Sequence, residues 1–121
     1  MTPDDGMVLS IWRGLVPLDP PGFSAMKAVT KRVYDGVLAL VELDTGISRE
    51  AIDGRSRYAE IVRARQYAMW LLRQRLDKWG RPVHSYPLIG AAMHLDHTTV
   101  LWGVRAHQAR LDALQAQQVA A

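Results

Sequence analysis

The chain contains no cysteine, and this absence alone removes several kinds of chemistry. Disulfide frameworks, cysteine-based metal sites and thiol nucleophiles all need a residue that is not present. No apolar run approaches the ~20 residues that a membrane-spanning helix requires. The opening segment, MTPDDGMVLS, also lacks the basic and then apolar order of a secretory signal. These absences predict a cytoplasmic protein that has no membrane partner.

Sequence motifs for catalysis and for nucleotide binding are absent too. No run of the form G-x-x-x-x-G-K-[ST] occurs, so no nucleotide is expected as cofactor or partner. His94, Asp96 and His97 come nearest to a metal site, but they straddle an expected turn and lack a fourth ligand. No glycine motif for an oxyanion hole accompanies His97 and Thr98. The sequence therefore predicts neither an enzyme nor a resident cofactor.

What the chain does have is an uneven distribution of charge. Residues 1–54 hold 5 Lys or Arg and 8 Asp or Glu, whereas residues 55–121 hold 10 and 4. Six arginines fall between residues 55 and 75, where Glu60 is the single acidic residue. A guanidinium can donate two hydrogen bonds at once to a phosphate or a guanine edge. A solvated helix face explains such a run equally well, so the charge nominates a nucleic acid without identifying one.

Apolar residues spaced three or four apart predict an all-α fold, a small helical bundle without strands. Residues 1–23 hold four of the six prolines and are interpreted as an arm, followed by one domain at 24–116 and a tail at 117–121. Ser24 is expected to cap the first helix, and Leu114 to face inward from the last. The helices are expected at about residues 24–43, 48–53, 56–75, 85–93 and 96–116.

The last two expected helices are joined by a tight connection at His94–Leu95, an arrangement typical of a helix-turn-helix. In that motif the first turn of the second helix reaches base edges in the major groove. The Asp96 carboxylate can accept from a cytosine amino group, and Thr98 and Thr99 can contact thymine methyls or phosphates. The alternative is an ordinary surface helix, in which Asp96 only caps and both threonines are simply exposed.

Two sequence blocks resemble the carboxy-terminal DNA-binding domain of the bacterial replication initiator DnaA. They are SRYAEIVRARQYAMWL and DHTTVL, with PLIG upstream of the second, and the likeness runs from about Val29 to Leu111. It implies an all-helical, Trp-repressor-like helix-turn-helix domain, free-standing and without the ATPase module. It further implies binding to double-stranded DNA at short DnaA-box-like sites in the nucleoid, where the protein regulates transcription or replication initiation.

The resemblance implies DNA contacts at nine positions. Arg57 resembles the arginine that the family inserts into the minor groove, and Pro87 lies where a loop touches the DNA backbone. Asp96, His97 and Thr99 match the residues that read the major groove, with Thr98 nearer the phosphates. Of the other three, Arg65 and Gln66 match residues near the DNA backbone and bases, and Arg73 matches a position where a lysine is common.

The chain also departs from the family pattern. Met93-His94-Leu95 stands where a Gly-Gly-Arg run is usual, and the loop at 76–84 is longer than usual. Trp102 replaces a common histidine. A second interpretation therefore stays open, in which the chain kept the fold as a protein-interaction module. Its partner would bind through the arm at 1–23 or the amphipathic helix at 95–116.

Overall fold

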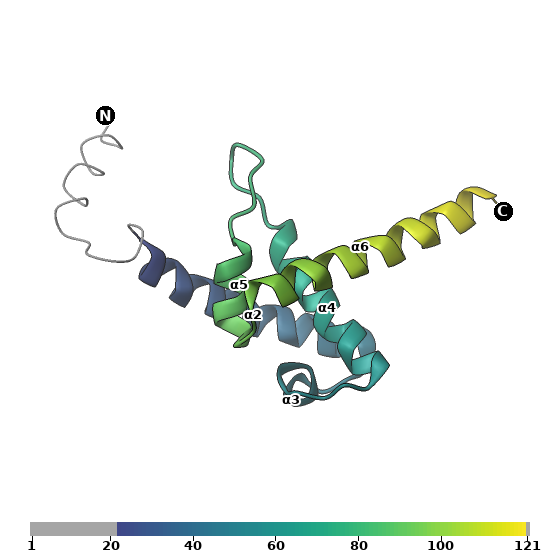
Figure 1. Cartoon of the computed structure of the whole chain (residues 1–121), viewed down its shortest axis with the longest axis horizontal. Helices are drawn as coiled ribbons and strands as arrows, with labels where there is room; N and C mark the ends of the chain where they lie inside the picture. The colour runs from purple at the N-terminus through teal and green to yellow at the C-terminus, as the bar shows by residue number, and fades with distance from the viewer. Residues whose placement is uncertain (1–21, 121) are drawn as a thin grey trace.

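The computed structural model describes residues 22–120, so nearly all of the expected arm at 1–23 lies outside the described residues. Within this range the chain is helical and has no strand, which confirms the predicted all-α class (Figure 1). The helices are α2 (Phe23–Thr45), α3 (Arg49–Asp53), α4 (Ala59–Gln74), α5 (Tyr86–Met93) and α6 (His97–Ala120).

The helix ends show where local chemistry decided the boundaries. Gly46 ends α2 in the left-handed conformation, and its N–H donates to the Glu42 carbonyl at 2.8 Å, as expected for a glycine stop. The prediction that Ser24 caps α2 is wrong, because Gly22 occupies the cap position and Ser24 lies inside the helix. The Ser56 hydroxyl accepts from the Tyr58 N–H at 3.2 Å. This local bond competes with helix formation, so α4 starts three residues later than expected.

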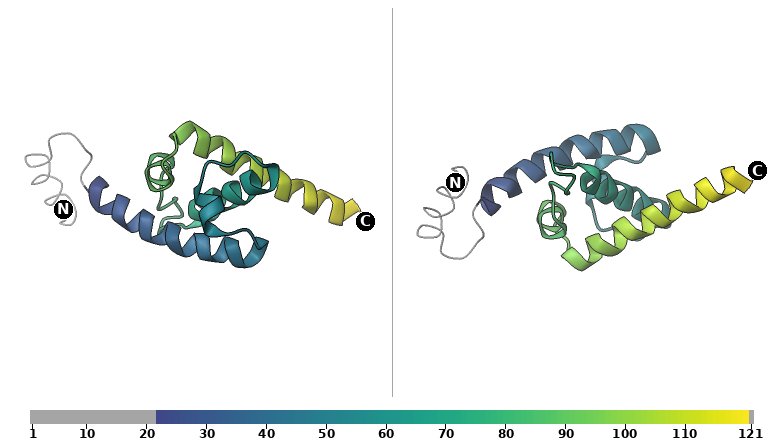
Figure 2. Two further views of the ribbon diagram at one scale, coloured as in Figure 1. Left: turned by 90° about the horizontal axis from the view of Figure 1, so that it is seen from below. Right: turned by 90° about the horizontal axis from the view of Figure 1, so that it is seen from above.

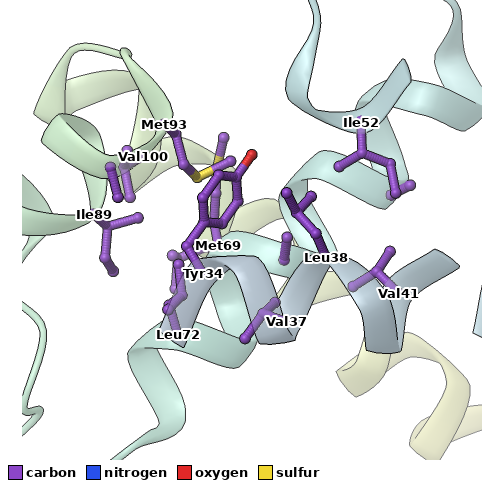
Figure 3. Close-up of a cluster of buried hydrophobic side chains, with 14 residues drawn as sticks. Tyr34, Val37, Leu38, Val41, Ile52, Met69, Leu72, Ile89, Met93 and Val100 are labelled. Atoms are coloured by element: carbon purple, nitrogen blue, oxygen red, sulfur yellow. The ribbon is translucent and has the colours of Figure 1, made fainter. Parts of the chain in front are cut away.

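The core lies where α2, α4, α5 and the first half of α6 meet, and α3 contributes Ile52 to it. Figure 3 shows the ring of Tyr34 in the middle of this cluster, surrounded by aliphatic and methionine side chains. The fully or nearly fully buried side chains include Tyr34, Val37, Leu38, Val41, Ile52, Met69, Leu72, Ile89, Met93 and Val100. Burial of this apolar surface is the main stabilising contribution in a domain of this size.

Helix α6 lies on the opposite side of the molecule from α2, with α4 between them (Figure 2). Its first half packs against the core, since Val100 and Val104 are buried as expected. Its second half continues past the body of the domain as a single helix (Figure 1). The prediction that Leu114 faces inward is wrong, because no other element of residues 22–120 lies beside this part of α6 and the side chain is 55% exposed.

Candidate nucleic-acid interface

The turn between α5 and α6 is fixed by one glycine. His94 ends α5 in the left-handed conformation at φ 57°, and the N–H of Leu95 donates to the Gly90 carbonyl at 2.8 Å. A Cβ atom on Gly90 would lie only 2.5 Å from the Leu95 carbonyl oxygen. Because the chain passes this close to α5, only glycine allows α6 to leave the turn at the observed angle. The two helices form the expected helix-turn-helix.

A second glycine sets the distance between α6 and α4. A Cβ atom on Gly103 would overlap the Met69 sulfur atom and lie 3.3 Å from the Gln66 Cγ. This close approach, together with buried Val100 and Val104, pins one face of α6 to the core. The opposite face of its first turn is consequently left toward solvent.

The first turn of α6 is capped and exposed at the same time. An Asp96 carboxylate oxygen accepts from the Thr98 N–H at 3.0 Å, so Asp96 is a true N-cap. That hydrogen bond, assisted by the nearby imidazole of His97, lowers the pKa of Asp96 and keeps the carboxylate ionised. The ring nitrogen Nδ1 of His97 lies 3.7 Å from the same carboxylate. His97, Thr98 and Thr99 all present their side chains to solvent.

The loop that carries Arg57 lies beside the helix-turn-helix. A cavity of about 190 Å³ is lined by Asp53, Gly54 and Arg55 on one side and by the residues of the turn, Met93–Leu95, on the other. Arg57 follows two residues after this lining and is exposed. The fold thus brings the loop between α3 and α4 and the start of α6 to the same end of the bundle.

Arg65 and Gln66 connect elements within the protein. The Arg65 guanidinium donates to the carbonyl oxygens of Ile52 at 2.9 Å and Ser56 at 3.1 Å, one on each side of the loop that leads to Arg57. The Gln66 side-chain oxygen accepts from the Arg110 guanidinium at 2.7 Å, which ties α4 to α6. Both side chains are half-buried. Arg65 holds the loop before α4 in place, and Gln66 holds α6 against α4.

Arg73 and Pro87 lie at the two sides of the connection between α4 and α5. The Arg73 guanidinium donates to the His84 carbonyl at 3.1 Å and lies 3.9 Å from the centre of the Tyr86 ring. Pro87 is exposed in the first turn of α5, where its missing N–H costs nothing. The Ser85 hydroxyl accepts from the Leu88 N–H at 3.3 Å, so Ser85 is the N-cap of α5.

Sequence reasoning missed Gly90 and the cationic groove beside the turn. The groove, about 290 Å³, runs between α2 and α5 and is lined by Lys27, Lys31 and His94 among others. A glycine in the middle of the helix-forming run PLIGAAM was the available signal, since glycine in a helix interior normally costs stability. The lysines gave no signal, because they lie about 65 residues from the turn in sequence.

Two further findings concern the described residues 22–120. No group of three or more His, Asp or Glu side chains comes together there in a way that could hold a metal ion. No helix in that range has the length and apolar character needed to cross a bilayer.

Comparison of the sequence with known proteins identifies a family. Residues 34–106 match the family model described as "Bacterial dnaA protein helix-turn-helix". "Chromosomal replication initiator protein DnaA 1" of Chlamydia muridarum is 43% identical over 67 residues, which are 55% of this chain and 13% of that protein. "Chromosomal replication initiator protein DnaA" of Picosynechococcus sp. is 42% identical over 69 residues, 56% of this chain and 14% of that protein.

The chain thus spans only about one-seventh of the length of the curated relatives it matches. No solved structure matches it. The matched region contains all nine residues for which DNA contacts are expected, and membership in a helix-turn-helix family of this kind implies DNA binding. The chain belongs to the bacterial DnaA helix-turn-helix family.

Proposed function

We propose that the protein binds double-stranded DNA in a sequence-specific manner by inserting the first turn of α6 into the major groove. One observation carries the proposal, namely that His97, Thr98 and Thr99 are exposed at a helix start whose packing is fixed from behind by Gly90. A reading element needs this combination, since its side chains must be free while its backbone is held in place. Membership in the bacterial DnaA helix-turn-helix family supports DNA as the partner.

The proposed roles follow the geometry. Asp96, His97 and Thr99 face base edges, while Thr98 lies nearer to a phosphate. Arg57, on the exposed loop beside the turn, enters the adjacent minor groove, where a narrow A·T-rich segment attracts a guanidinium. These assignments keep base reading on α6 and leave minor-groove reading to the loop.

The remaining expected residues lie around this pair of reading elements. Pro87 touches the DNA backbone from the exposed start of α5. Arg65, Gln66 and Arg73 contribute mainly through the internal hydrogen bonds that hold the loop, α6 and the start of α5 in register. Their N–H groups that are not used internally can still point to phosphates.

The proposed biological role is regulation at sites similar to DnaA boxes, in transcription or in replication initiation within the nucleoid. The named relatives are chromosomal replication initiators, and this chain shares one helix-turn-helix region with them. A protein with this region binds the same class of site and acts there as a regulator or as a competitor.

Selection from a random duplex library tests the proposal most directly. The protein is expected to enrich one asymmetric sequence, and a labelled duplex of that sequence should bind tighter than a scrambled one by a factor of about 10³ or more. Equal binding to the selected and the scrambled duplex would remove sequence specificity. No binding to either duplex would remove DNA as the partner.

The structure also offers an observation in favour of the protein-interaction module. In the second half of α6, which no other described element covers, Leu114 is 55% exposed and Val119 is 87% exposed. Truncation after Ala113 separates the two functions. Under the DNA-binding proposal the truncated chain keeps its specific affinity, whereas an interaction module built on this helix loses its partner.

A further inference from the structure

The connection between α4 and α5 forms a projecting loop, residues 75–83, which we call the 75–83 loop. Figure 1 shows it extending from the body of the domain beyond the start of α5. Its two arms are paired, since the Val83 N–H donates to the Arg75 carbonyl and the Asp77 N–H donates to the Arg81 carbonyl, each at 2.8 Å. An isolated bridge between Leu76 and Pro82 lies between these bonds. The loop therefore has a defined backbone structure, with two paired arms.

Asp77 organises the tip of the loop. One of its carboxylate oxygens accepts from the N–H groups of Trp79 at 2.8 Å and Arg81 at 3.0 Å. These backbone hydrogen bonds, that from Arg81 above all, lower the pKa of the Asp77 carboxyl. Gly80 supplies the left-handed residue of the turn at φ 81°, and its N–H donates to the Asp77 carbonyl at 3.0 Å. The backbone of the tip is consequently held in a defined turn, on which Lys78, Trp79 and Arg81 are exposed.

The tip presents an aromatic ring between two cations. Trp79 is 67% exposed, and the Lys78 ammonium lies 4.5 Å and the Arg81 guanidinium 5.0 Å from its ring centre. With Arg75 at the base and Asp77 as the only acidic residue, the loop carries a net charge of +2. Lysine and arginine beside an exposed ring form a surface suited to a sugar–phosphate backbone.

The base of the loop is anchored to the scaffold on two sides. On one side, the guanidinium of Arg73 in α4 donates to the His84 carbonyl. On the other side, the hydroxyl of Thr30 in α2 lies 2.7 Å from Nδ1 of the buried His84 ring. Ser85, the cap of α5, follows directly. The loop thus adjoins the start of α5, while the loop carrying Arg57 lies beside the far end of α5, at its turn into α6 (Figure 1).

We infer that the 75–83 loop is an additional DNA-contacting element that binds the backbone on the flank of the site opposite to Arg57. Lys78 and Arg81 bind phosphate oxygens, and the Trp79 ring packs against the neighbouring deoxyribose. This inference rests on the proposed DNA binding, because only a duplex held by α6 runs past both ends of α5. Charge and continuity with the start of α5 favour DNA over an apolar protein surface as the occupant.

The test uses the full chain and the duplex sequence obtained by selection, in three lengths. One duplex carries about ten extra base pairs on both flanks, and the other two are each trimmed on one flank. Lys78→Ala and Trp79→Ala are compared with Arg32→Ala, which removes an exposed charge from α2, on the opposite side of the molecule from α6. Melting curves of all variants verify that the exposed substitutions leave the fold intact.

On the long duplex, Lys78→Ala is expected to weaken binding about eightfold at ~0.1 M salt and to reduce the log–log salt slope by about 0.9, the effect of one lost phosphate contact. Trp79→Ala should weaken binding without changing that slope, since the ring carries no charge. Trimming the flank opposite to Arg57 should abolish both effects, whereas trimming the Arg57 flank should leave them. Arg32→Ala should match the parent chain on all three duplexes.

Three outcomes would overturn the inference. Lys78→Ala and Trp79→Ala could match the parent on the long duplex, in which case the parent's specific binding still supports the proposed function. Equal slope changes in Lys78→Ala and Arg32→Ala would show an effect of net charge alone. Failure of the parent chain to bind any of the duplexes would remove the proposed function and this inference with it.

Discussion

At the scale of single residues, the first turn of α6 combines a capping residue with exposed residues for which we propose a DNA-reading role. Asp96 makes the capping hydrogen bond to Thr98, while His97 and Thr99 are exposed and make no contribution to the core. Exposed side chains can be removed at little cost in folding free energy. The two properties can therefore be measured independently on this turn.

Replacing His97 or Thr99 by alanine is expected to relax DNA specificity and leave the fold unchanged. Each lost base contact should reduce discrimination between the selected and a mismatched duplex by about 1–3 kcal/mol. The free energy of unfolding should change by no more than about 0.5 kcal/mol. Competition binding and urea unfolding measure the two quantities. If both variants keep the parent's discrimination, the turn is a helix start without a reading role.

Asp96 caps α6 and is also proposed to read a base, and two substitutions distinguish the two roles. Asp96→Ala should lower the melting temperature, because the Thr98 N–H loses its acceptor. Asp96→Ser keeps a capping oxygen but is shorter and uncharged, so it should retain most of the stability and still lose preference for one base. Equal discrimination by Asp96→Ser and the parent would restrict Asp96 to capping.

His84 predicts a dependence of stability on pH. Burial, followed by the nearby charge of Arg75, lowers the pKa of this histidine below its ordinary value of 6.5. The unfolded chain therefore takes up a proton first as the pH falls below about 6.5, and the free energy of unfolding decreases from there down to the folded-state pKa. His84→Gln should reduce this slope in thermal melts at pH 5–7.

If His84→Gln leaves the pH dependence of stability unchanged, another titrating group causes it. His107 is the other candidate, because burial and the charge of Arg110 lower its pKa in the same direction. Its ring stacks on Tyr67 with centres 5.0 Å apart, in the packing of α6 against α4. His107→Gln is therefore the second arm of the same experiment.

At the scale of elements, the angle between α5 and α6 depends on how closely two backbone segments approach. The segment after α5 can pass close to α5 because His94 adopts the left-handed conformation and Gly90 has no side chain. A non-glycine residue in the left-handed region is strained by about 1–3 kcal/mol. The chain accepts this strain at the turn, and the family pattern usually has glycine there.

Gly90→Ala is expected to destabilise the domain, and Gly36→Ala provides the matched control. A methyl group at position 90 meets the Leu95 carbonyl at 2.5 Å, so the turn must shift at a cost of about 1–3 kcal/mol. A methyl group at position 36 meets nothing within 4 Å in the middle of α2, so this variant should gain about 0.5–1 kcal/mol. Chemical denaturation measures both, and equal effects would disprove the role given to Gly90.

At the scale of the whole molecule, the distribution of basic residues can be compared with the position of the helix-turn-helix. The amino-terminal half of the chain is net acidic and the remainder net basic. Helix α2, from the first half, lies on one side of the bundle, and α6 lies on the other. The basic residues of positions 55–120 lie in α4, in α6 and in the loops beside the helix-turn-helix, and Lys27 and Lys31 of α2 line the groove beside the turn, an arrangement that favours approach of a polyanion.

Arg57 is expected to set a preference at one edge of the DNA site. Arg57→Ala should remove a preference for narrow, A·T-rich sequence at that edge and leave the centre of the selected site unchanged. The salt slope on the selected duplex should fall by about 0.9. Library selection repeated with the variant gives the first result and titration at several salt concentrations the second. An identical edge preference in variant and parent would make Arg57 a structural residue.

The sequence by itself determined the helices and the position of the turn. Gly46, Ser48 and Ser85 act through hydrogen bonds within a few residues, so their capping roles could be read from local pattern alone. The polar helix start at Asp96–Thr99 could also be predicted from the sequence, because four polar residues come directly before the apolar run that begins at Val100. Errors arose where a competing contact was also local, as at Ser56, or where burial was assumed, as at Leu114.

Only the tertiary structure decided which arginines are free. In sequence, Arg57, Arg65 and Arg73 are similar members of one basic run. In the fold, Arg65 holds the carbonyls of the loop before α4, Arg73 holds His84, and Arg57 remains exposed beside the turn. Their partners are 9 to 13 residues away or lie in another element, and no periodicity records such distances. Whether a guanidinium meets a carbonyl or solvent is a property of packing, which the linear order of residues does not contain.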